Sequence, residues 1–296
     1  MSSYLGASTT SEPFEALDAS SDEVRGLILH ALSEDLGQGD ITTRVTIPEG
    51  MKARGTFMSK QRLVVAGLPV AAKLFEILDA SLEWSAVEEE GSEVLAGSPL
   101  AIVSGSAPSL LAGERVALNF LQHLSGIATL ARRLKEELAG LRAEFLDTRK
   151  TTPGLRTLQK YAVRVGGGRN HRLRLDDGIL IKNNHLRLVG NVRTAIEAAR
   201  RNRPADFHIE VEVASLRELE EAMAAGADVI LLDNMTPEGV RQCVGRAGGR
   251  VRLEVSGGID ASNIRAYAET GVDFISVGAL THSAPAVDMN FRIEPA

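Results

Sequence analysis

The sequence predicts an α/β protein whose larger part is a barrel of parallel strands. From Ala143 onward, short apolar runs alternate with segments of helical periodicity, at the spacing of repeated strand–helix units. Polar or glycine-rich residues follow nearly every run, as on the active-site face of such a barrel. The predicted strands are Glu144–Leu146, Ile179–Ile181, His208–Val213, Val229–Leu232, Val251–Val255 and Phe274–Val277, with helices at 155–165, 190–201, 215–225, 237–246 and 260–270.

The residues at the strand ends favour a barrel over an open sheet, and we expect one further strand that the pattern does not reveal. In a barrel all carboxyl ends converge on one face, whereas an open sheet uses only the ends near a switch point. Here nearly every end carries groups suited to binding a ligand. These groups are Asp147-Thr148-Arg149-Lys150, Lys182-Asn183-Asn184-His185, Glu212, Asp233-Asn234, Ser256-Gly257-Gly258 and Gly278-Ala279-Leu280.

The first residues of the chain have a different character. Residues 1–21 are polar, and we expect a flexible leader. Ser20 and Glu23 have the spacing of a capping box at the start of a helix, which Gly37 would end.

A second domain is indicated between this helix and the predicted barrel. Short strands around one helix near 69–78 are expected for residues 53–105, followed by a long helix from Ser109 to Leu138. The alternating pattern of Val287–Ile293 indicates a last strand that returns to this N-terminal sheet.

Composition excludes several classes of protein. The chain has 296 residues, of which 44% are hydrophobic and 24% charged, as in ordinary globular proteins. We expect no membrane association, because no apolar run is long enough to span a bilayer. A pI near 5.6 argues against nucleic acid as a partner. Cys243 is the single cysteine, which excludes an internal disulfide and favours the cytoplasm.

A cationic segment lies within this acidic chain. Between Arg149 and Arg187 there are ten Lys or Arg residues and two acids, whereas the whole chain has a net charge of −6. Arg suits bidentate contacts with carboxylate or phosphate, and Lys acts as a compact point charge. Gly166-Gly167-Gly168 allows the backbone to approach a ligand closely. We therefore expect a small substrate that bears several negative groups.

Two acids end neighbouring predicted strands. Glu212 and Asp233 are suited to binding Mg²⁺ or ribose hydroxyls or to acting as general bases. A single acid at such a place is more often a helix cap or an ion-pair partner. Glu210 shares a face with Glu212 by strand alternation, so the spacing does not choose between them.

Two glycine loops follow the last two strands. Ser256-Gly257-Gly258-Ile259 and Ser276-Val277-Gly278-Ala279-Leu280 stand where barrels often bind phosphate through backbone N–H groups. Each loop alone fits a tight turn equally well, but the pair in this order favours a phosphate site.

Three basic residues leave alternatives open. Lys182 at a strand end suits a Schiff base, although its neighbours fit charge binding better. His171, beside Arg169 and Arg172, is the best functional candidate among six histidines. Arg115 lies in an otherwise apolar helix, where a structural ion pair is equally consistent with the sequence.

Together these motifs resemble the quinolinate phosphoribosyltransferase family, whose members are also called nicotinate-nucleotide pyrophosphorylase (carboxylating). The resemblance covers most of the chain beyond the leader, and so many segments in one order are far more specific than any one. The segments that carry it are Glu34–Thr42, Glu114–Asn119, Asp147–Arg156, Lys160–Arg172, Leu180–His185, Glu210–Val213, Leu232–Met235, Glu254–Ile259 and Ser276–Ser283.

The resemblance implies an architecture and an assembly. It implies an N-terminal α/β sandwich domain over 22–118, to which 284–296 returns, and an incomplete, seven-stranded α/β barrel over 119–283. It also implies a homodimer or an assembly of dimers, in which Arg115 of one subunit completes the site of the other.

The resemblance also implies a reaction and the residues that perform it. Phosphoribosyl passes from phosphoribosyl pyrophosphate to quinolinate with loss of CO₂. Glu212 and Asp233 serve the ribose and Mg²⁺, which the substrate mainly carries and which is the one cofactor implied. The two glycine loops hold the 5-phosphate, and catalysis is expected of Lys150, Lys182 and these two acids. The residues expected around the quinolinate carboxylates and the pyrophosphate are Thr148, Arg149, Lys150, His171, Arg172 and Lys182.

Three other functions remain open from the sequence. Relatives associated with molybdenum uptake have the same fold and another base as substrate, although the full cationic set favours a dicarboxylate. A non-catalytic phosphate-binding barrel would lack strand-end acids or lysines, and none is missing here. The third alternative is an aldolase that acts through Lys182.

Overall fold

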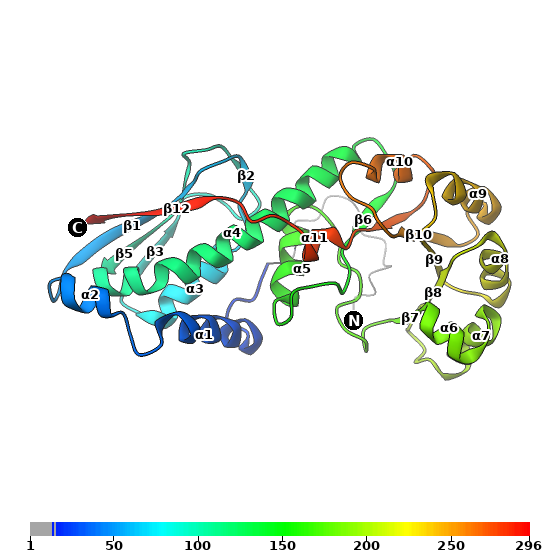
Figure 1. Cartoon of the computed structure of the whole chain (residues 1–296), viewed down its shortest axis with the longest axis horizontal. Coiled ribbons are helices and arrows are strands. Elements are labelled where there is room, and N and C mark those ends of the chain that lie inside the picture. The colour runs from blue at the N-terminus through cyan, green and yellow to red at the C-terminus, as the bar shows by residue number, and fades with distance from the viewer. Residues whose placement is uncertain (1–13, 15) are drawn as a thin grey trace. The chain divides into compact units, whose positions relative to one another are not determined.

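The structure is a computed structural model that describes residue 14 and residues 16–296, and these form two compact units (Figure 1). The unit that we call the parallel unit contains residues 133–151 and 168–283. The antiparallel unit contains residues 14, 16–132, 152–167 and 284–296. Of the expected leader, residues 1–13 and 15 lie outside the described residues.

Six parallel strands form the sheet of the parallel unit, in the order β6-β11-β10-β9-β8-β7. All five residues of β8 are buried, as expected for a strand covered on both faces. The six predicted strands are confirmed to within one residue at each end. They are β6 (Glu144–Leu146), β7 (Ile179–Ile181), β8 (Ile209–Val213), β9 (Val229–Asp233), β10 (Arg252–Ser256) and β11 (Phe274–Ser276).

A seventh strand is represented among the described residues by one bridge. Arg169 pairs with Leu146 in parallel at the free edge of β6. The backbone N–H of Arg169 donates to Phe145, and that of Asp147 donates to Arg169. The pairing does not extend further, so the described sheet has six strands, and closure into a seven-stranded barrel stays a prediction.

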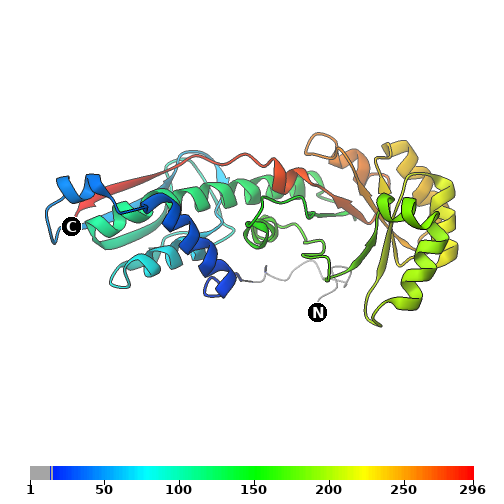
Figure 2. The ribbon, with the colours of Figure 1, turned by 60° about the horizontal axis from the view of Figure 1, so that its bottom comes forward.

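Helices connect the strands, and α7, α8 and α9 lie side by side along one face of the sheet (Figure 2). Each of these three begins at a side chain that accepts the third N–H of the helix, namely that of Asn191, Ser215 and Thr236. The helices of this unit are α6 (Asn183–Val189), α7 (Val192–Asn202), α8 (Leu216–Ala225), α9 (Pro237–Ala247), α10 (Ile264–Ala268) and α11 (Ala279–His282).

Two helices of the parallel unit differ from the prediction. The short α6 was not predicted, and α10 covers only part of the helix expected at 260–270. Asp260 explains the late start of α10. Its carboxylate accepts the N–H of Ser262, and its own N–H donates to the Asn263 side chain. Such local side-chain bonds compete with helical pairing.

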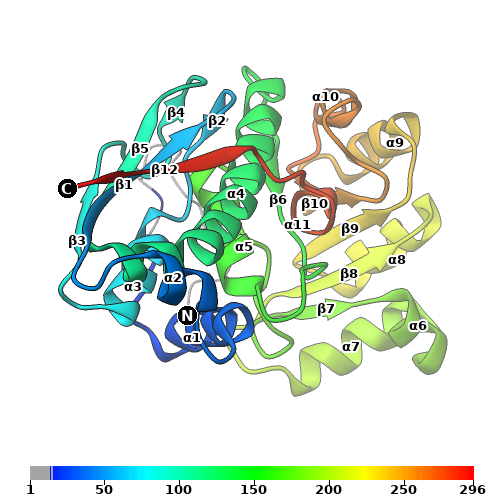
Figure 3. The same cartoon turned by 60° about the vertical axis from the view of Figure 1, so that its left-hand side comes forward.

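The antiparallel unit contains a four-stranded sheet in the order β12-β1-β5-β3. The predicted return of the C-terminus is confirmed, because β12 pairs antiparallel with β1 (Figure 3). Phe57 of β1 packs on Phe75 and Trp84 in the core. The strands of this unit are β1 (Lys52–Ser59), β2 (Leu63–Val64), β3 (Glu83–Ala86), β4 (Glu93–Val94), β5 (Pro99–Ser106) and β12 (Met289–Pro295).

Five helices begin in the antiparallel unit, and they include the predicted helix near 69–78 and the predicted long helix. No described helix has an apolar stretch sufficient to cross a membrane. The helices are α1 (Asp22–Leu36), α2 (Ile41–Thr46), α3 (Leu68–Leu78), α4 (Ala107–Glu137) and α5 (Arg156–Val165).

The cap of α1 differs from the sequence analysis. The helix α1 is capped by Ser21, whose hydroxyl accepts the N–H of Val24, and not by Ser20. Ser20 lies in the preceding turn, where its N–H donates to Asp18. The domain boundary expected at 118/119 lies within α4, the long helix that the sequence predicts, and it stays a prediction.

Gly55 provides a test of how β12 packs on β1. A Cβ atom at Gly55 would lie 1.9 Å from Cζ of Phe291. Gly55→Ala should therefore lower the free energy of unfolding by about 1–3 kcal/mol, the usual cost of overpacking. Urea unfolding measures the effect. Gly26→Ala in α1 is the control, since nothing lies near its Cβ, and it should stabilise by roughly 0.5–1 kcal/mol. Equal stability of the Gly55→Ala and wild-type chains would contradict the packing.

Candidate active site

The carboxyl edge of the parallel sheet carries the predicted acids and one of the lysines at neighbouring positions. Ile181 pairs with Val211, so Lys182 stands level with Glu212. Glu212 pairs in turn with Leu231, two residues before Asp233. Since parallel strands keep their direction, the ends of β7, β8 and β9 meet at one edge.

These strand ends are joined by one hydrogen-bonded network. Lys182 Nζ forms an ion pair with Glu212 Oε1. The backbone N–H of Asn183 donates to Glu212 Oε2 at 3.2 Å, and its side-chain amide donates to Asp233 Oδ2 at 3.2 Å. Asn183 thereby fixes the two acids relative to each other. The sequence analysis assigned it no role, although it stands in the quoted strand-end motif.

Asn234 fixes Asp233 from the other side. Its side-chain amide donates to Asp233 Oδ1 at 2.9 Å, and its backbone N–H donates to Ser256 O at 2.9 Å. Asn234 has φ of 55°, the one positive value among the described non-glycine residues. Gly257, with φ of 112°, leaves room for it, because a Cβ there would lie 2.3 Å from Asn234 Oδ1.

A second group of residues holds the segment after β6 against the loop after β11. The N–H of Lys150 donates to Thr148 Oγ1 at 3.0 Å, and Thr281 Oγ1 donates to the carbonyl of Lys150 at 2.8 Å. A Cβ at Gly278 would lie 3.1 Å from Cδ of Lys150. The lysine side chain therefore passes directly over the second glycine loop.

The cationic segment predicted as one patch is divided by the fold. Arg149, Lys150, Arg172 and Lys182 belong to the parallel unit, whereas the basic residues of α5 belong to the antiparallel unit. Lys160 of α5 is only 1% exposed, so it is a core residue of that unit. A count along the sequence does not distinguish these environments.

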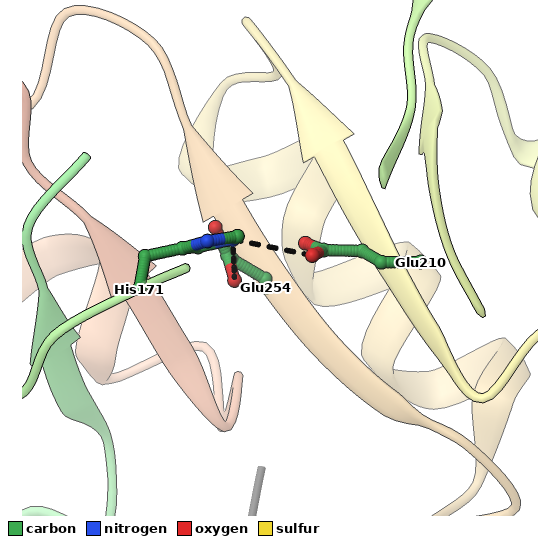
Figure 4. A group of neighbouring side chains, drawn as sticks. All are labelled: His171, Glu210 and Glu254. Atoms are coloured by element: carbon green, nitrogen blue, oxygen red, sulfur yellow. Dashed lines mark ion pairs between the residues drawn. The ribbon is translucent and has the colours of Figure 1, made fainter. Parts of the chain in front are cut away.

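A buried carboxylate shapes the segment that contains His171. Asp147, which is fully buried, accepts the side-chain amide of Asn170 at 2.5 Å and the N–H of His171 at 2.9 Å. Arg172 is also buried, and its guanidinium donates to Gly178 O at 2.7 Å. These bonds place the His171 side chain beside the face of the sheet that carries Glu210 and Glu254 (Figure 4).

His171 points at two glutamates of the sheet (Figure 4). Its Nε2 lies 3.2 Å from Glu210 Oε2 and 3.7 Å from Glu254 Oε2. Ser276 Oγ donates to Glu254 Oε1 at 2.5 Å. Burial, together with the neighbouring charge of Glu210, raises the pKa of Glu254 to about 8. Burial and this neighbouring charge therefore favour the protonated form of Glu254.

The spacing in the sequence did not choose between Glu210 and Glu212, but the structure places them in different environments. Glu212 joins the strand-end network, whereas Glu210 lies deeper beside His171. Glu254 was missed, although an acid inside an apolar strand, two residues before Ser256 and on the same face of the strand, is a signal for it. Arg115 is exposed on α4 of the antiparallel unit, and no ion pair of the described residues includes it.

The remaining predicted residues belong to the two glycine loops. Ser256 and Gly257 are partly buried, and Gly258, with φ of 62°, is exposed. Gly278 and Ala279 are partly buried at the start of α11, whereas the Leu280 side chain is fully buried in the core. Any contact of Leu280 with a ligand must therefore come from its backbone.

Lysines, acids and glycine turns gathered at the carboxyl edge of a parallel α/β sheet define an enzyme class that acts on small, phosphate-bearing anions. The chain belongs to the quinolinate phosphoribosyl transferase family. The model of the family's N-terminal domain matches residues 40–125, and that of its C-terminal domain matches residues 127–292.

Known proteins agree with this assignment. The probable nicotinate-nucleotide pyrophosphorylase (carboxylating) of Synechocystis sp. is 43% identical over 267 residues, which cover 88% of this chain and 90% of that protein. The nicotinate-nucleotide pyrophosphorylase (carboxylating) of Mycobacterium leprae is 43% identical, covering 93% of this chain and 99% of that protein. The crystal structure of NadC from Streptococcus pyogenes is similar with a TM-score of 0.91 at 40% identity, covering 95% and 99%.

The raised pKa of Glu254 predicts a pH dependence of stability. Between about pH 5 and 8, Glu254 keeps its proton in the folded chain and has lost it in the unfolded chain. The contribution of Glu254 to the free energy of unfolding therefore falls as pH rises. Glu254→Gln should remove that part of the slope. Urea unfolding at several pH values across this window measures it, with Glu238→Gln on exposed α9 as the control. Identical slopes for the wild type and Glu254→Gln would contradict the protonated state.

Proposed function

We propose that this chain transfers phosphoribosyl from phosphoribosyl pyrophosphate to quinolinate, with loss of CO₂, as a step of NAD biosynthesis. Membership of the family and the names of the relatives support this reaction. The observation that carries it is the network of Lys182, Glu212, Asn183 and Asp233 across three adjacent strand ends. It presents cations and acids together, as a pyrophosphate leaving group on ribose requires.

The chemistry needs no group beyond these residues and the ion described below. The pyridine nitrogen of quinolinate attacks C1 of the ribose, and pyrophosphate leaves with the electrons of the broken C–O bond. The alkylated ring nitrogen is then cationic, so its charge stabilises the electron pair that stays on the adjacent ring carbon when the 2-carboxylate leaves as CO₂. A proton replaces the carboxylate at that carbon, which gives nicotinate mononucleotide.

The cationic residues of the parallel unit are assigned to the two anionic substrates. Arg149, Lys150, Arg172 and Lys182 neutralise the quinolinate carboxylates and the departing pyrophosphate, and His171 lies among them. The Thr148 hydroxyl accepts a hydrogen bond from the backbone N–H of Lys150 and so fixes the backbone of the lysine. The loops at Ser256–Gly258 and Gly278–Leu280 bind the 5-phosphate through backbone N–H groups.

The strand-end acids fit a Mg²⁺ ion that arrives with the substrate. Both are hard oxygen donors, but each of their four oxygens already accepts a bond, from Lys182, Asn183 or Asn234. This arrangement suits outer-sphere contacts to a hydrated Mg²⁺ on pyrophosphate better than direct coordination of the ion by protein groups alone. When bound, Mg²⁺ would neutralise charge on the leaving group. Glu212 and Asp233 would hold it and stabilise positive charge on the ribosyl carbon.

We further propose that the parallel sheet closes as an incomplete, seven-stranded barrel, with the bridge at Arg169 as the reduced seventh strand. The active enzyme is a homodimer or an assembly of dimers. The exposed Arg115 of one subunit serves the site of the other. A two-fold interface is self-complementary, so both sites of a dimer gain the same residue. The proposed compartment is the cytoplasm.

The reaction is tested by product analysis with Mg²⁺, phosphoribosyl pyrophosphate and quinolinate labelled in the 2-carboxylate. We expect labelled CO₂ and nicotinate mononucleotide in equal amounts, and no turnover in excess chelator. Consumption of phosphoribosyl pyrophosphate without labelled CO₂ would point to a relative with another base. Full activity in the chelator would contradict the role of Mg²⁺.

No observation favours the aldolase alternative. The ammonium group of Lys182 lies in an ion pair with Glu212, whereas a Schiff base requires a neutral, nucleophilic amine. Borohydride trapping with a carbonyl substrate tests this alternative, and we expect no covalent adduct.

Lys150→Ala and Lys182→Ala should each lose most activity and remain folded. Each removes one preorganised charge contact at the carboxyl edge of the sheet, which typically costs about 10²–10³ in rate. Both side chains are exposed, so their loss should leave the core unchanged. Steady-state kinetics and thermal unfolding measure the two effects. Wild-type turnover would contradict the assignment, and unfolding would indicate a structural role.

Mixing of inactive subunits should test whether Arg115 acts in trans. When Arg115→Ala and Lys150→Ala subunits are exchanged, a mixed dimer has one site with both lesions and one with neither. Activity should then recover to roughly a quarter of wild type, because about half the dimers are mixed and half their sites are intact. The control mixture is Lys150→Ala with Lys182→Ala, which should not recover. No recovery of the first mixture, with exchange verified, would contradict the proposal.

A further inference from the structure

Lys182 is the N-cap residue of α6, a position to which a lysine is poorly suited. An N-cap residue usually accepts a helix N–H with its side chain. Asn191, Ser215 and Thr236 do so for α7, α8 and α9. A lysine side chain has three donors and no acceptor. The start of α6 therefore needs another way to hold its N-cap residue.

His185 provides this hold through a bond in the opposite direction. The backbone N–H of Lys182 donates to Nδ1 of His185 at 2.8 Å. The backbone N–H of His185 donates to the carbonyl of Lys182, also at 2.8 Å. A glutamine or glutamate at the third helical position often accepts the N-cap N–H in this way. Here a histidine takes that position, and it bonds to the backbone of Lys182 on both sides.

These two bonds fix the lysine where the sheet no longer does. The pairing of β7 with β8 ends at Ile181, so the N–H of Lys182 turns to the His185 ring. The next residue, Asn183, is held by Glu212 and Asp233. The backbone of Lys182 is thus fixed from both neighbouring sides. A lysine side chain is long and flexible, so its ammonium is placed well only if its backbone is fixed.

Two other roles would fit a histidine at this edge. The ring could contact a substrate, but Nδ1 already accepts the N–H of Lys182, which leaves only Nε2. The ring could also serve as a cap of α6 with no effect on the reaction. The contacts favour a role through Lys182, because the bonds of the ring and of the His185 N–H both end on that residue, whose ammonium pairs with Glu212.

We propose that His185 is a positioning residue for the reaction: it fixes the backbone of Lys182 and so holds the lysine ammonium beside Glu212. The inference rests on the proposed function, in which Lys182 neutralises the departing pyrophosphate. His185 acts through Lys182, and its ring neither binds the substrate nor transfers a proton. Without this bond the ammonium is less well placed for the charge that develops on the leaving group, so kcat should fall.

Substitutions at position 185 test whether the acceptor or the ring matters. His185→Ala should lower kcat by about tenfold, the order expected for one hydrogen bond. His185→Gln restores an acceptor at the third helical position, so it should recover most of kcat. His185→Phe keeps a ring without an acceptor and should resemble His185→Ala. Leu188→Ala is the control, since this side chain of α6 is 90% exposed, and kcat should not change. Wild-type kcat in His185→Ala, or no recovery in His185→Gln, would overturn the proposal.

A double-mutant cycle with Lys182→Ala separates positioning from the two other roles. Once the ammonium is removed, His185 has nothing left to position. The rate of Lys182→Ala should therefore equal that of the chain with both substitutions. A structural cap or a direct substrate contact instead predicts a further loss of about tenfold in the double variant, and this result would refute positioning. Thermal unfolding of all variants, measured alongside, should show folded chains.

Hydrogen–deuterium exchange at the Lys182 amide tests the bond independently of activity. Exchange should be about tenfold faster in His185→Ala than in the wild type, because the amide loses its acceptor, and His185→Gln should restore protection. Equal exchange in the wild type and His185→Ala would contradict the bond and with it the proposal. If the wild type forms no nicotinate mononucleotide, the proposed function fails, while the exchange rates still decide whether His185 holds Lys182.

Discussion

The parallel hydrogen bonding of six short strands is the constraint on which the candidate site depends. Because the strands run in one direction, their carboxyl ends meet at one edge and bring Lys182, Glu212 and Asp233 together from distant parts of the sequence. Asn183 then bonds to both acids, so the register of the sheet also sets the distance between them. A slip of one residue in β8 would turn Glu212 to the helical face and remove both contacts.

Side-chain alternation along β8 places Glu210 and Glu212 on the same face of the sheet, but at different distances from its carboxyl edge. Glu212 forms an ion pair with Lys182 at the edge. Glu210, two residues earlier, is fully buried, and its carboxylate lies beside His171. At the edge, Glu212 accepts bonds from Lys182 and from the backbone N–H of Asn183. Burial raises the pKa of Glu254, which lies beside Glu210 and His171. Two glutamates of one strand that look equivalent in sequence thus lie beside different partners.

Much of this was predictable, because hydrophobic periodicity and strand-end chemistry are local properties. All six strands, the return of β12 and the strand-end acids follow from them. The tertiary contacts were not predictable in this way. Lys160 and Lys182 look alike in the cationic segment, but one is buried in α5 and the other is exposed at the sheet edge. Glu254 interrupts an apolar strand, and only its partners Ser276 and Glu210 reveal why.

The contact between Asn234 and Gly257 has a consequence for how this chain can change over evolutionary time. Asn234 adopts a left-handed backbone that few side chains accept, and its amide occupies the space of a Cβ at position 257. A larger residue at position 257 would push that amide away from Asp233. Neither position can therefore vary alone. Combinatorial libraries that aim to alter the glycine loop should vary 234 and 257 as one unit, and covariation of the two among homologues would be the historical trace of this restriction.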